Sequence, residues 1–187
     1  MTFVPVVILA IGAAFPPLRI PAEHLRHFDS MSEQRHVVTV TESTWVARPP
    51  EAVWDYTQDY TRRTEWDAGV AEAAILGTEP RSVRVNIPNL GAMTVVYRLD
   101  RRPERTSAAF TDVDSAWVSG GGGSWEYEAV DGGTRWQQTN SLELKHPRLA
   151  FLLGPVMERG LRRSMQRAMA EAKRRLEAGA PAEPSGA

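Results

Sequence analysis

The sequence of 187 residues contains no cysteine, and it has only four histidines. Disulfide bonds, iron–sulfur clusters, cysteine-ligated zinc and thiol nucleophiles are therefore excluded. An excess of either charge is also lacking, because the formal net charge is -1. Binding to phosphate backbones needs a clear basic excess, so this balance argues against a nucleic-acid partner. The chemistry must come from carboxylates, hydroxyls, amides, the few histidines or the shape of an apolar core.

The sequence also has no apolar run long enough to span a membrane as a helix. The run from Phe3 to Ala14 is shorter than the ~20 residues that a membrane-spanning helix needs, and no basic residue precedes it, as one would in a secretory signal. We consider three interpretations of residues 1–35: a wrongly assigned start codon, since Met31 lies close before the first strand-like stretch; a disordered or loosely docked extension; or a weak export signal. We expect a cytoplasmic protein without an integral membrane span.

The pattern after this extension is that of a strand followed by helices. Residues 36–46 are rich in β-branched side chains and partly alternate in hydropathy, which predicts a strand. Its inward face would carry Val38, Val40, Thr44 and Val46. Pro50 suits the first turn of a helix, and two short helices are expected over roughly 50–58 and 61–66.

From residue 70 to residue 144, apolar and polar residues again alternate with a period of two. Strands are predicted over 70–76, 83–87, 93–99, 105–113, 124–130 and 134–144. Turn residues separate them, notably at 88–91 and 131–133. About seven strands without a long helix between them predict an antiparallel meander.

The glycine run at 119–124 is not a phosphate-binding loop, because neither a Gly-Lys-Ser/Thr sequence nor a helix start follows it. We interpret it as a flexible connection between two strands. The alternative is a mobile rim that gates a cavity, which the conformational freedom of glycine would permit.

The last predicted element is a long amphipathic helix over about 147–176. Its apolar stripe contains Met157, Leu161, Met165, Ala168, Met169, Ala172 and Leu176, wide enough to pack on a sheet. Residues 149–157 are apolar on all sides, so we expect them to be covered from several directions. Residues 145–177 hold nine basic and three acidic residues, which indicates a solvated face or, alternatively, a site for anionic lipid headgroups or an acidic protein.

Strand, two short helices, meander and long terminal helix is an unusual order, and it resembles the START-like superfamily, also called SRPBCC. The local sequence is similar too, with Pro49 at the strand end, then Val53-Trp54, Asp59 and Trp66. The stretch SWEYEAVDGGTRWQQT resembles the polyketide cyclase/dehydrase-like branch. The resemblance covers roughly residues 36–177, and residues 178–187 read as a disordered tail.

This resemblance implies an α+β helix-grip fold, in which a curved antiparallel sheet wraps around the long C-terminal helix and leaves a cavity. Members of the superfamily bind lipids, polyketides, sterols or other hydrophobic molecules. Some members cyclise and dehydrate poly-keto chains, and others assist quinone handling or bind protein partners. These motifs belong to the scaffold, so they identify a fold far better than a reaction.

Strand parity predicts which side chains face such a cavity. The ligand-binding candidates are Trp66, Val85, Met93, Val95, Tyr97, Phe110, Trp136, Gln138, Asn140 and Met165. Glu42 on the first strand also counts inward. Glu42, Gln138 and Asn140 are polar, and a buried polar group without a partner costs ~1–3 kcal/mol, so each needs a partner from the protein, from water or from a ligand.

Candidates for acid/base chemistry are few: Glu42, Asp67, Tyr97 and Asp112. Burial in an apolar cavity would raise the pKa of a carboxyl towards neutrality. His24 and His27 form an HxxH pair without a third ligand, so neither a metal nor any other cofactor is expected.

The leading hypothesis is that the chain binds, or binds and transports, a hydrophobic small molecule such as a lipid or a polyketide. The alternative is a polyketide cyclase, aromatase or dehydratase. A further alternative is a protein-interaction module that uses the basic helix face or an exposed aromatic patch, with an unidentified protein partner.

Overall fold

The computed structural model describes residues 36–146 and 149–179. The extension predicted over 1–35 and residues 180–187 of the predicted tail lie outside the described residues. The elements, in chain order, are β1 (Val37–Val46), α2 (Pro50–Thr57), η1 (Tyr60–Arg62), α3 (Arg63–Trp66), β2 (Glu72–Thr78), β3 (Arg81–Ile87), β4 (Gly91–Arg101), β5 (Arg105–Asp114), β6 (Val118–Val130), β7 (Gly133–Leu144) and α4 (Ala150–Ala178).

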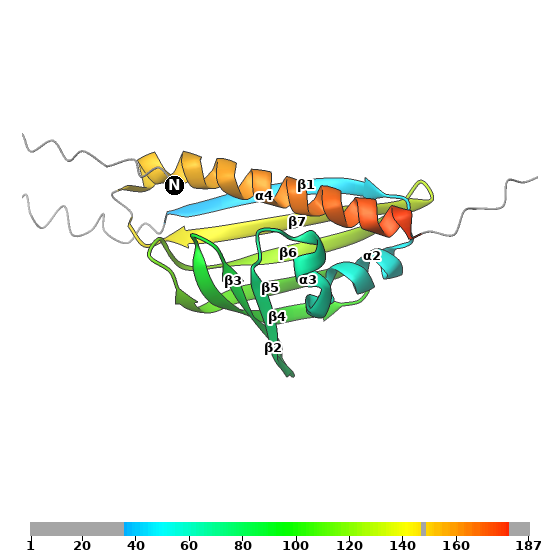
Figure 1. Ribbon diagram of the computed structural model, residues 1–187, viewed down its shortest axis with the longest axis horizontal. Helices are drawn as coiled ribbons and strands as arrows, with labels where there is room; N and C mark the ends of the chain where they lie inside the picture. Colours follow the sequence, from blue (N-terminus) through cyan, green and yellow to red (C-terminus); the bar gives the residue numbers. More distant parts are fainter. Residues whose placement is uncertain (1–35, 147–148, 180–187) are drawn as a thin grey trace, which may run out of the picture. The chain divides into compact units, whose positions relative to one another are not determined.

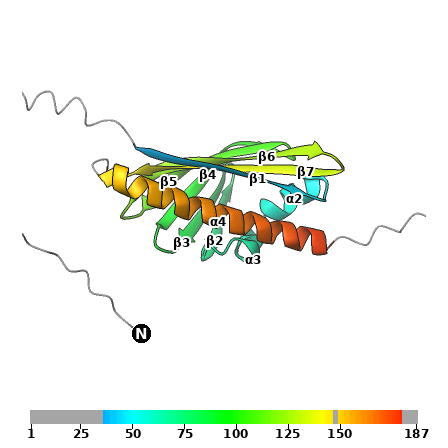
Figure 2. The ribbon, with the colours of Figure 1, turned by 90° about the horizontal axis from the view of Figure 1, so that it is seen from above.

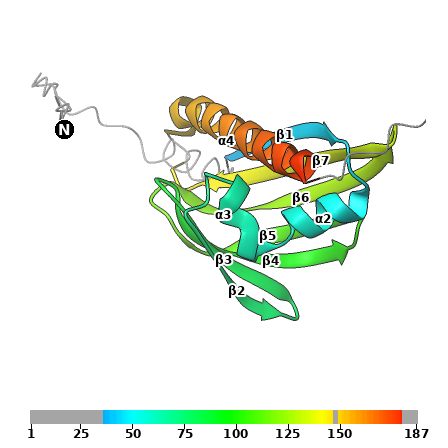
Figure 3. The same cartoon turned by 45° about the vertical axis from the view of Figure 1, so that its right-hand side comes forward.

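The strands form one seven-stranded antiparallel sheet in the order β1-β7-β6-β5-β4-β3-β2. Strands β2 to β7 are a meander, and β1 pairs with the last strand, β7. Helix α4 crosses this sheet, and α2 and α3 lie beside it on the same face (Figures 1 and 3). This architecture confirms the α+β helix-grip fold that the resemblance implied.

The pairing of β1 with β7 confirms the predicted parity. Val38, Val40 and Val46 are buried on β1. On β7 the buried side chains are Thr134, Trp136, Gln138, Leu142 and Leu144. The register places Glu42 opposite Gln138, so the polar residues of the two strands lie on the same inward face.

The prediction for the glycine run was wrong. Residues 119–124 belong to β6, where Gly122 pairs with Ala109 on β5 and with Ser141 on β7. A Cβ on Gly122 would lie 2.7 Å from the carbonyl oxygen of Ala108, and Gly121 has a φ of +148°. The glycines therefore allow the backbones of β5, β6 and β7 to approach closely. The glycine run indicates tight packing of these strands and not a flexible connection.

Helix α4 packs tightly only along its C-terminal half. It runs beside β1 (Figure 2), and its buried residues are Met165, Ala168, Met169, Ala172 and Leu176. Met157 and Leu161, on the same stripe, are half-buried. The predicted stripe is thus confirmed, but its two halves lie in different surroundings.

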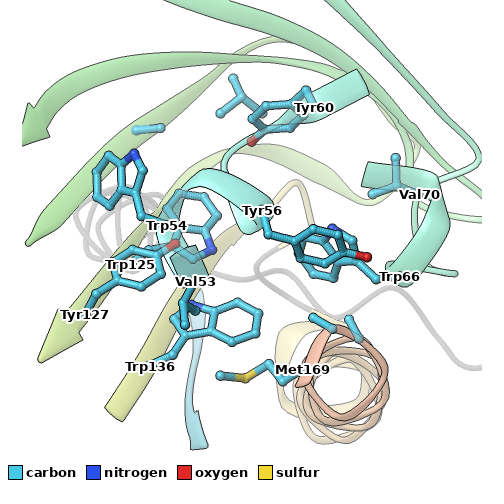
Figure 4. Close-up of a cluster of buried hydrophobic side chains, with 14 of the residues drawn as sticks. Val53, Trp54, Tyr56, Tyr60, Trp66, Val70, Trp125, Tyr127, Trp136 and Met169 are labelled. Atoms are coloured by element: carbon cyan, nitrogen blue, oxygen red, sulfur yellow. The ribbon is translucent and has the colours of Figure 1, made fainter. Parts of the chain in front are cut away.

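An aromatic core fills the space under the C-terminal half of α4. The rings of Trp66 and Trp136 meet edge to face with their centroids 5.9 Å apart, and Tyr127 stacks on Trp136 at 6.3 Å. Figure 4 shows Trp66, Trp136 and Met169, from three different elements, gathered at this end of the helix. Large aromatic side chains each bury ~150–250 Å², so this cluster anchors α4 to the sheet.

The expectation that residues 149–157 are covered from several sides was also wrong. Phe151 is 72% exposed, Leu152 59% and Val156 68%. Leu153 and Met157, which point the other way, are half-buried. Pro155 lies inside the helix, which already begins at Ala150. The first turns of α4 therefore present apolar side chains on their outer as well as their inner side.

Candidate ligand-binding cavity

A cavity of about 550 Å³ lies between the sheet and the N-terminal half of α4. Ligand pockets in proteins commonly have volumes of ~300–1,000 Å³. Strands β3 to β7 form its floor, α4 forms one wall, and the segment from Tyr60 to Val70 forms another. The space therefore occupies the half of the sheet that the aromatic core leaves unfilled.

Most of the lining is apolar. The strands contribute Val85, Ile87, Met93, Val95, Phe110, Trp125 and Leu142, and α4 contributes Leu153, Met157 and Leu161. Methionine side chains, here Met93 and Met157, adapt to ligands of varied shape. Such a wall favours a hydrophobic occupant over a highly charged one.

Of the ten ligand-binding candidates, the structure places six in this lining: Val85, Met93, Val95, Phe110, Gln138 and Asn140. Trp66 and Trp136 belong to the aromatic core described above. Tyr97 lies behind the wall, with its ring stacked on Trp125 at 6.3 Å. Met165 is buried on α4 just past Ser164, the last helix residue in the lining. These four do not line the cavity.

One buried ion pair lies in the cavity wall. The Nε and Nη2 atoms of Arg63 donate to Oδ2 of Asp67 at 2.9 and 2.7 Å. Oδ1 of Asp67 accepts from the backbone N–H of Gly69 at 3.1 Å, and the Arg63 guanidinium lies 4.2 Å from the ring centroid of Trp66. Burial is the largest influence on the pKa of Arg63 and would lower it, but the interactions with Asp67, Tyr60 and Tyr97 together outweigh burial, so the pKa is raised. Asp67 thus supplies the counter-charge for the buried Arg63 guanidinium.

Polar side chains without hydrogen-bond partners also gather in the lining where β6 and β7 meet. The indole Nε1 of Trp125 is buried without a hydrogen-bond acceptor. Within the described part of the chain, the side-chain amides of Gln138 and Asn140 make no hydrogen bond either, although Gln138 is only 3% exposed. Trp125 pairs with Gln138, and Gly123 with Asn140, across β6 and β7. These three residues form a polar strip along one side of an apolar cavity, and the buried atom of the strip that lacks a partner is the Trp125 nitrogen.

The four acid/base candidates do not come together. Glu42 accepts hydrogen bonds from Nη1 of Arg162 at 2.6 Å and from Nε2 of Gln166 at 3.0 Å, so α4 supplies the partners that its inward position required. Asp112 is exposed on β5, where its carbonyl oxygen accepts from Arg84. Neither residue lines the cavity, and of the four candidates only Asp67 does.

Tyr97 belongs to a buried hydroxyl network instead. Its hydroxyl donates to Oε1 of Gln58 at 3.1 Å and lies 2.9 Å from the hydroxyl of Tyr60. Nε2 of Gln58 in turn donates to the hydroxyl of Tyr127 at 2.8 Å. Burial raises the pKa of Tyr97 well above its usual value. The phenol therefore stays protonated near neutral pH and ties α2 and η1 to the sheet.

The site contains residues that the sequence reasoning did not select, above all Arg63, Trp125 and the helix residues Leu153, Met157 and Leu161. The spacing of Arg63 and Asp67, four residues apart beside a tryptophan, could have indicated a helical ion pair. Trp125 alternates with Tyr127 on a strand, so parity could have placed it inward. The apolar stripe of α4 runs through both halves of the helix, so the stripe does not tell which half borders the cavity.

Two negative findings apply to residues 36–146 and 149–179. No group of three or more metal-ligating side chains is placed to hold a metal ion. No helix in this part of the chain combines the length and the hydropathy that crossing a membrane requires.

The family model described as polyketide cyclase / dehydrase and lipid transport matches residues 37–177. No curated protein sequence matches the chain. The match spans every strand and all but the final residue of α4.

Solved structures share the fold at low identity. A protein of Thermus thermophilus superposes with a TM-score of 0.65 at 18% identity, covering 76% of this chain and 99% of its own. The Zhui aromatase/cyclase from a Streptomyces species gives 0.62 at 22% identity, with 78% and 100% covered. A START superfamily protein from Mycobacterium smegmatis gives 0.62 at 14% identity, with 74% and 98% covered. At these identities the likeness shows the START-like fold and not the reaction.

Proposed function

Because the chain belongs to the polyketide cyclase/dehydrase and lipid transport family, we propose that it binds a hydrophobic small molecule between the sheet and α4. The observation that carries this proposal is the apolar cavity of about 550 Å³. Burial of apolar ligand surface supplies the driving force at about 25 cal/mol per Å². A ligand that buries roughly 300 Å² would gain roughly 7 kcal/mol before the costs of association.

The polar side chains of the lining narrow the class of ligand. Its charged residues are Arg63 and Asp67, which neutralise each other. A ligand carboxylate would be buried without a counter-charge, which is costly. The indole N–H of Trp125 and the amide of Gln138 instead offer donors to a neutral oxygen atom. We therefore favour a neutral apolar ligand with ketone or hydroxyl oxygens along one edge.

Extraction of the native protein followed by mass spectrometry tests the proposal. Wild-type protein purified without denaturant should release a reproducible apolar compound. The variant Val85→Phe, which fills the cavity from β3, should release less of it. Ile75→Phe is the matched control, because Ile75 is exposed on the neighbouring strand β2. The proposal fails if all three proteins carry the same compounds, or if wild-type protein is empty and excludes an added apolar dye.

We propose polyketide cyclisation as a second candidate function. It is supported by the fold shared with the Zhui aromatase/cyclase and by the place of Asp67 in the cavity wall. A carboxylate there could accept a proton from a carbon next to a ketone and so promote enolisation. Asp67→Asn should then slow turnover of a poly-ketone substrate by about 100-fold while dye binding persists. Unchanged turnover in a folded Asp67→Asn protein would leave binding as the better account.

A further inference from the structure

We infer that the outer side of α4, over its N-terminal half, is a docking surface for an anionic lipid bilayer. This surface, called the α4 ridge below, consists of Phe151, Leu152, Val156, Arg159, Arg163 and Arg167. The inference does not depend on the identity of the cavity ligand or on whether the chain is an enzyme.

The first part of the ridge is apolar and open to solvent. Phe151 and Val156 are the most exposed large apolar side chains in the described part of the chain. Leu152 and Val156 are four residues apart and therefore lie one above the other on the helix. Exposed apolar side chains scattered singly are ordinary, but three within six residues of one helix indicate a contact surface.

The second part of the ridge is basic. Arg159, Arg163 and Arg167 follow Leu152 and Val156 at spacings of three and four residues, so they continue the same helix face. All three are exposed, and none has an ion-pair partner within the described residues. Other arginines of the helix are paired: Arg162 with Glu42 and Glu158, and Arg174 and Arg175 with Glu171.

This combination identifies the occupant. The ridge places guanidinium groups without counter-charges beside exposed apolar side chains, and no acidic residue lies on the same helix face. Such a surface complements a partner whose outer layer is anionic and whose interior is apolar. An anionic bilayer has that order, since its phosphates meet the arginines while apolar side chains enter the acyl boundary. Apolar and basic side chains on one helix face are the pattern of interfacial helices.

The ridge and the cavity wall are opposite sides of the same turns of α4. Leu153, Met157 and Leu161 line the cavity from the inner side of the same turns. Trp117, which also lines the cavity, is 44% exposed. A bilayer bound to the ridge would therefore be separated from the cavity by α4 alone.

Vesicle co-sedimentation of the full chain tests the inference. Wild-type protein should sediment with vesicles containing phosphatidylserine, bind those of phosphatidylcholine alone far more weakly, and dissociate as salt is raised. Arg159→Gln/Arg163→Gln should weaken binding to the anionic vesicles by about fivefold for each arginine. Leu152→Glu/Val156→Glu should abolish it.

The control is Ile75→Glu/Leu76→Glu, since this pair on β2 is exposed to a similar degree but lies away from α4. Circular dichroism and a thermal melt establish that each variant is folded, and Val156→Ser gives a milder change at the ridge. Binding retained in both ridge variants, equal binding to neutral vesicles, or no binding at all would overturn the inference. A concentration-dependent dimer that the ridge variants dissociate, without vesicle binding, would assign the ridge to a second copy of the chain instead.

Discussion

Trp125 on β6 lies directly opposite Gln138 on β7 in the cavity wall, and its indole nitrogen is buried without a hydrogen-bond partner in the described chain. A buried polar group without a partner costs ~1–3 kcal/mol. An occupant with an acceptor oxygen at this point would remove part of that cost. The relationship between these two residues therefore links the stability of the empty protein to the nature of its ligand.

Removing the amide of Gln138 should separate oxygenated ligands from plain hydrocarbons. Gln138→Leu should weaken binding of a ketone-bearing aromatic probe by about fivefold, since one hydrogen bond contributes about 1 kcal/mol. Binding of a hydrocarbon probe of the same size should not weaken. Fluorescence titration of both probes measures the difference, and equal losses for the two would contradict the role of the polar strip.

Removing one partner of the ion pair in the wall should cost more stability than removing both. Asp67→Asn leaves the Arg63 charge buried without compensation and should lower the free energy of unfolding by about 3–5 kcal/mol. The double variant Arg63→Met/Asp67→Asn should lose less than the two single variants together. Urea unfolding of all four proteins gives the coupling energy, and additive losses would contradict a direct pair.

Two glycines should respond to alanine in opposite directions. A Cβ on Gly160, in the middle of α4, would meet no atom within 4 Å. Gly160→Ala should therefore stabilise the protein by about 0.5–1 kcal/mol through helix propensity. Gly122→Ala should destabilise it by about 1–3 kcal/mol, since the new Cβ would lie 2.7 Å from the backbone oxygen of Ala108. Melting temperatures that shift in the same direction for both variants would contradict the close approach of Gly122 to β5.

Stability should fall at alkaline pH. Burial raises the pKa values of Tyr97 and Tyr127 above the ordinary 10.0. Each tyrosine contributes stability that is fully present below pH 10 and is lost as pH rises, because the unfolded chain releases its proton first. The slope should reach about 1.4 kcal/mol per pH unit for each tyrosine. Urea unfolding at a series of pH values from 9 upward checks this. Tyr127→Phe should remove the contribution of one tyrosine from the slope of the unfolding free energy against pH.

The sequence predicted the scaffold well because its signals are local. Proline at a helix start, parity on β1 and β7, and turn residues such as Asn89, with its φ of 65°, act over a few residues. The glycine run misled because close approach to Ala108 and Ser141 is a property of paired strands. A single strand cannot reveal it.

The site was predicted only in part for a related reason. Parity identifies the inward face of a strand, and it placed Val85, Phe110 and Gln138 correctly on that face. It does not tell how closely α4 packs at each point along the sheet. Trp136 therefore faces inward as expected but meets the aromatic core, whereas Gln138, two residues later, borders the cavity.

The central claim is that the space between the sheet and α4 receives a hydrophobic molecule. Titration of wild-type protein, Val85→Phe and Ile75→Phe with one neutral apolar fluorophore tests it most directly. We predict saturable binding to wild-type protein and to Ile75→Phe with equal affinity, and at least about tenfold weaker binding to the folded Val85→Phe variant. Equal affinity of all three proteins would contradict the claim.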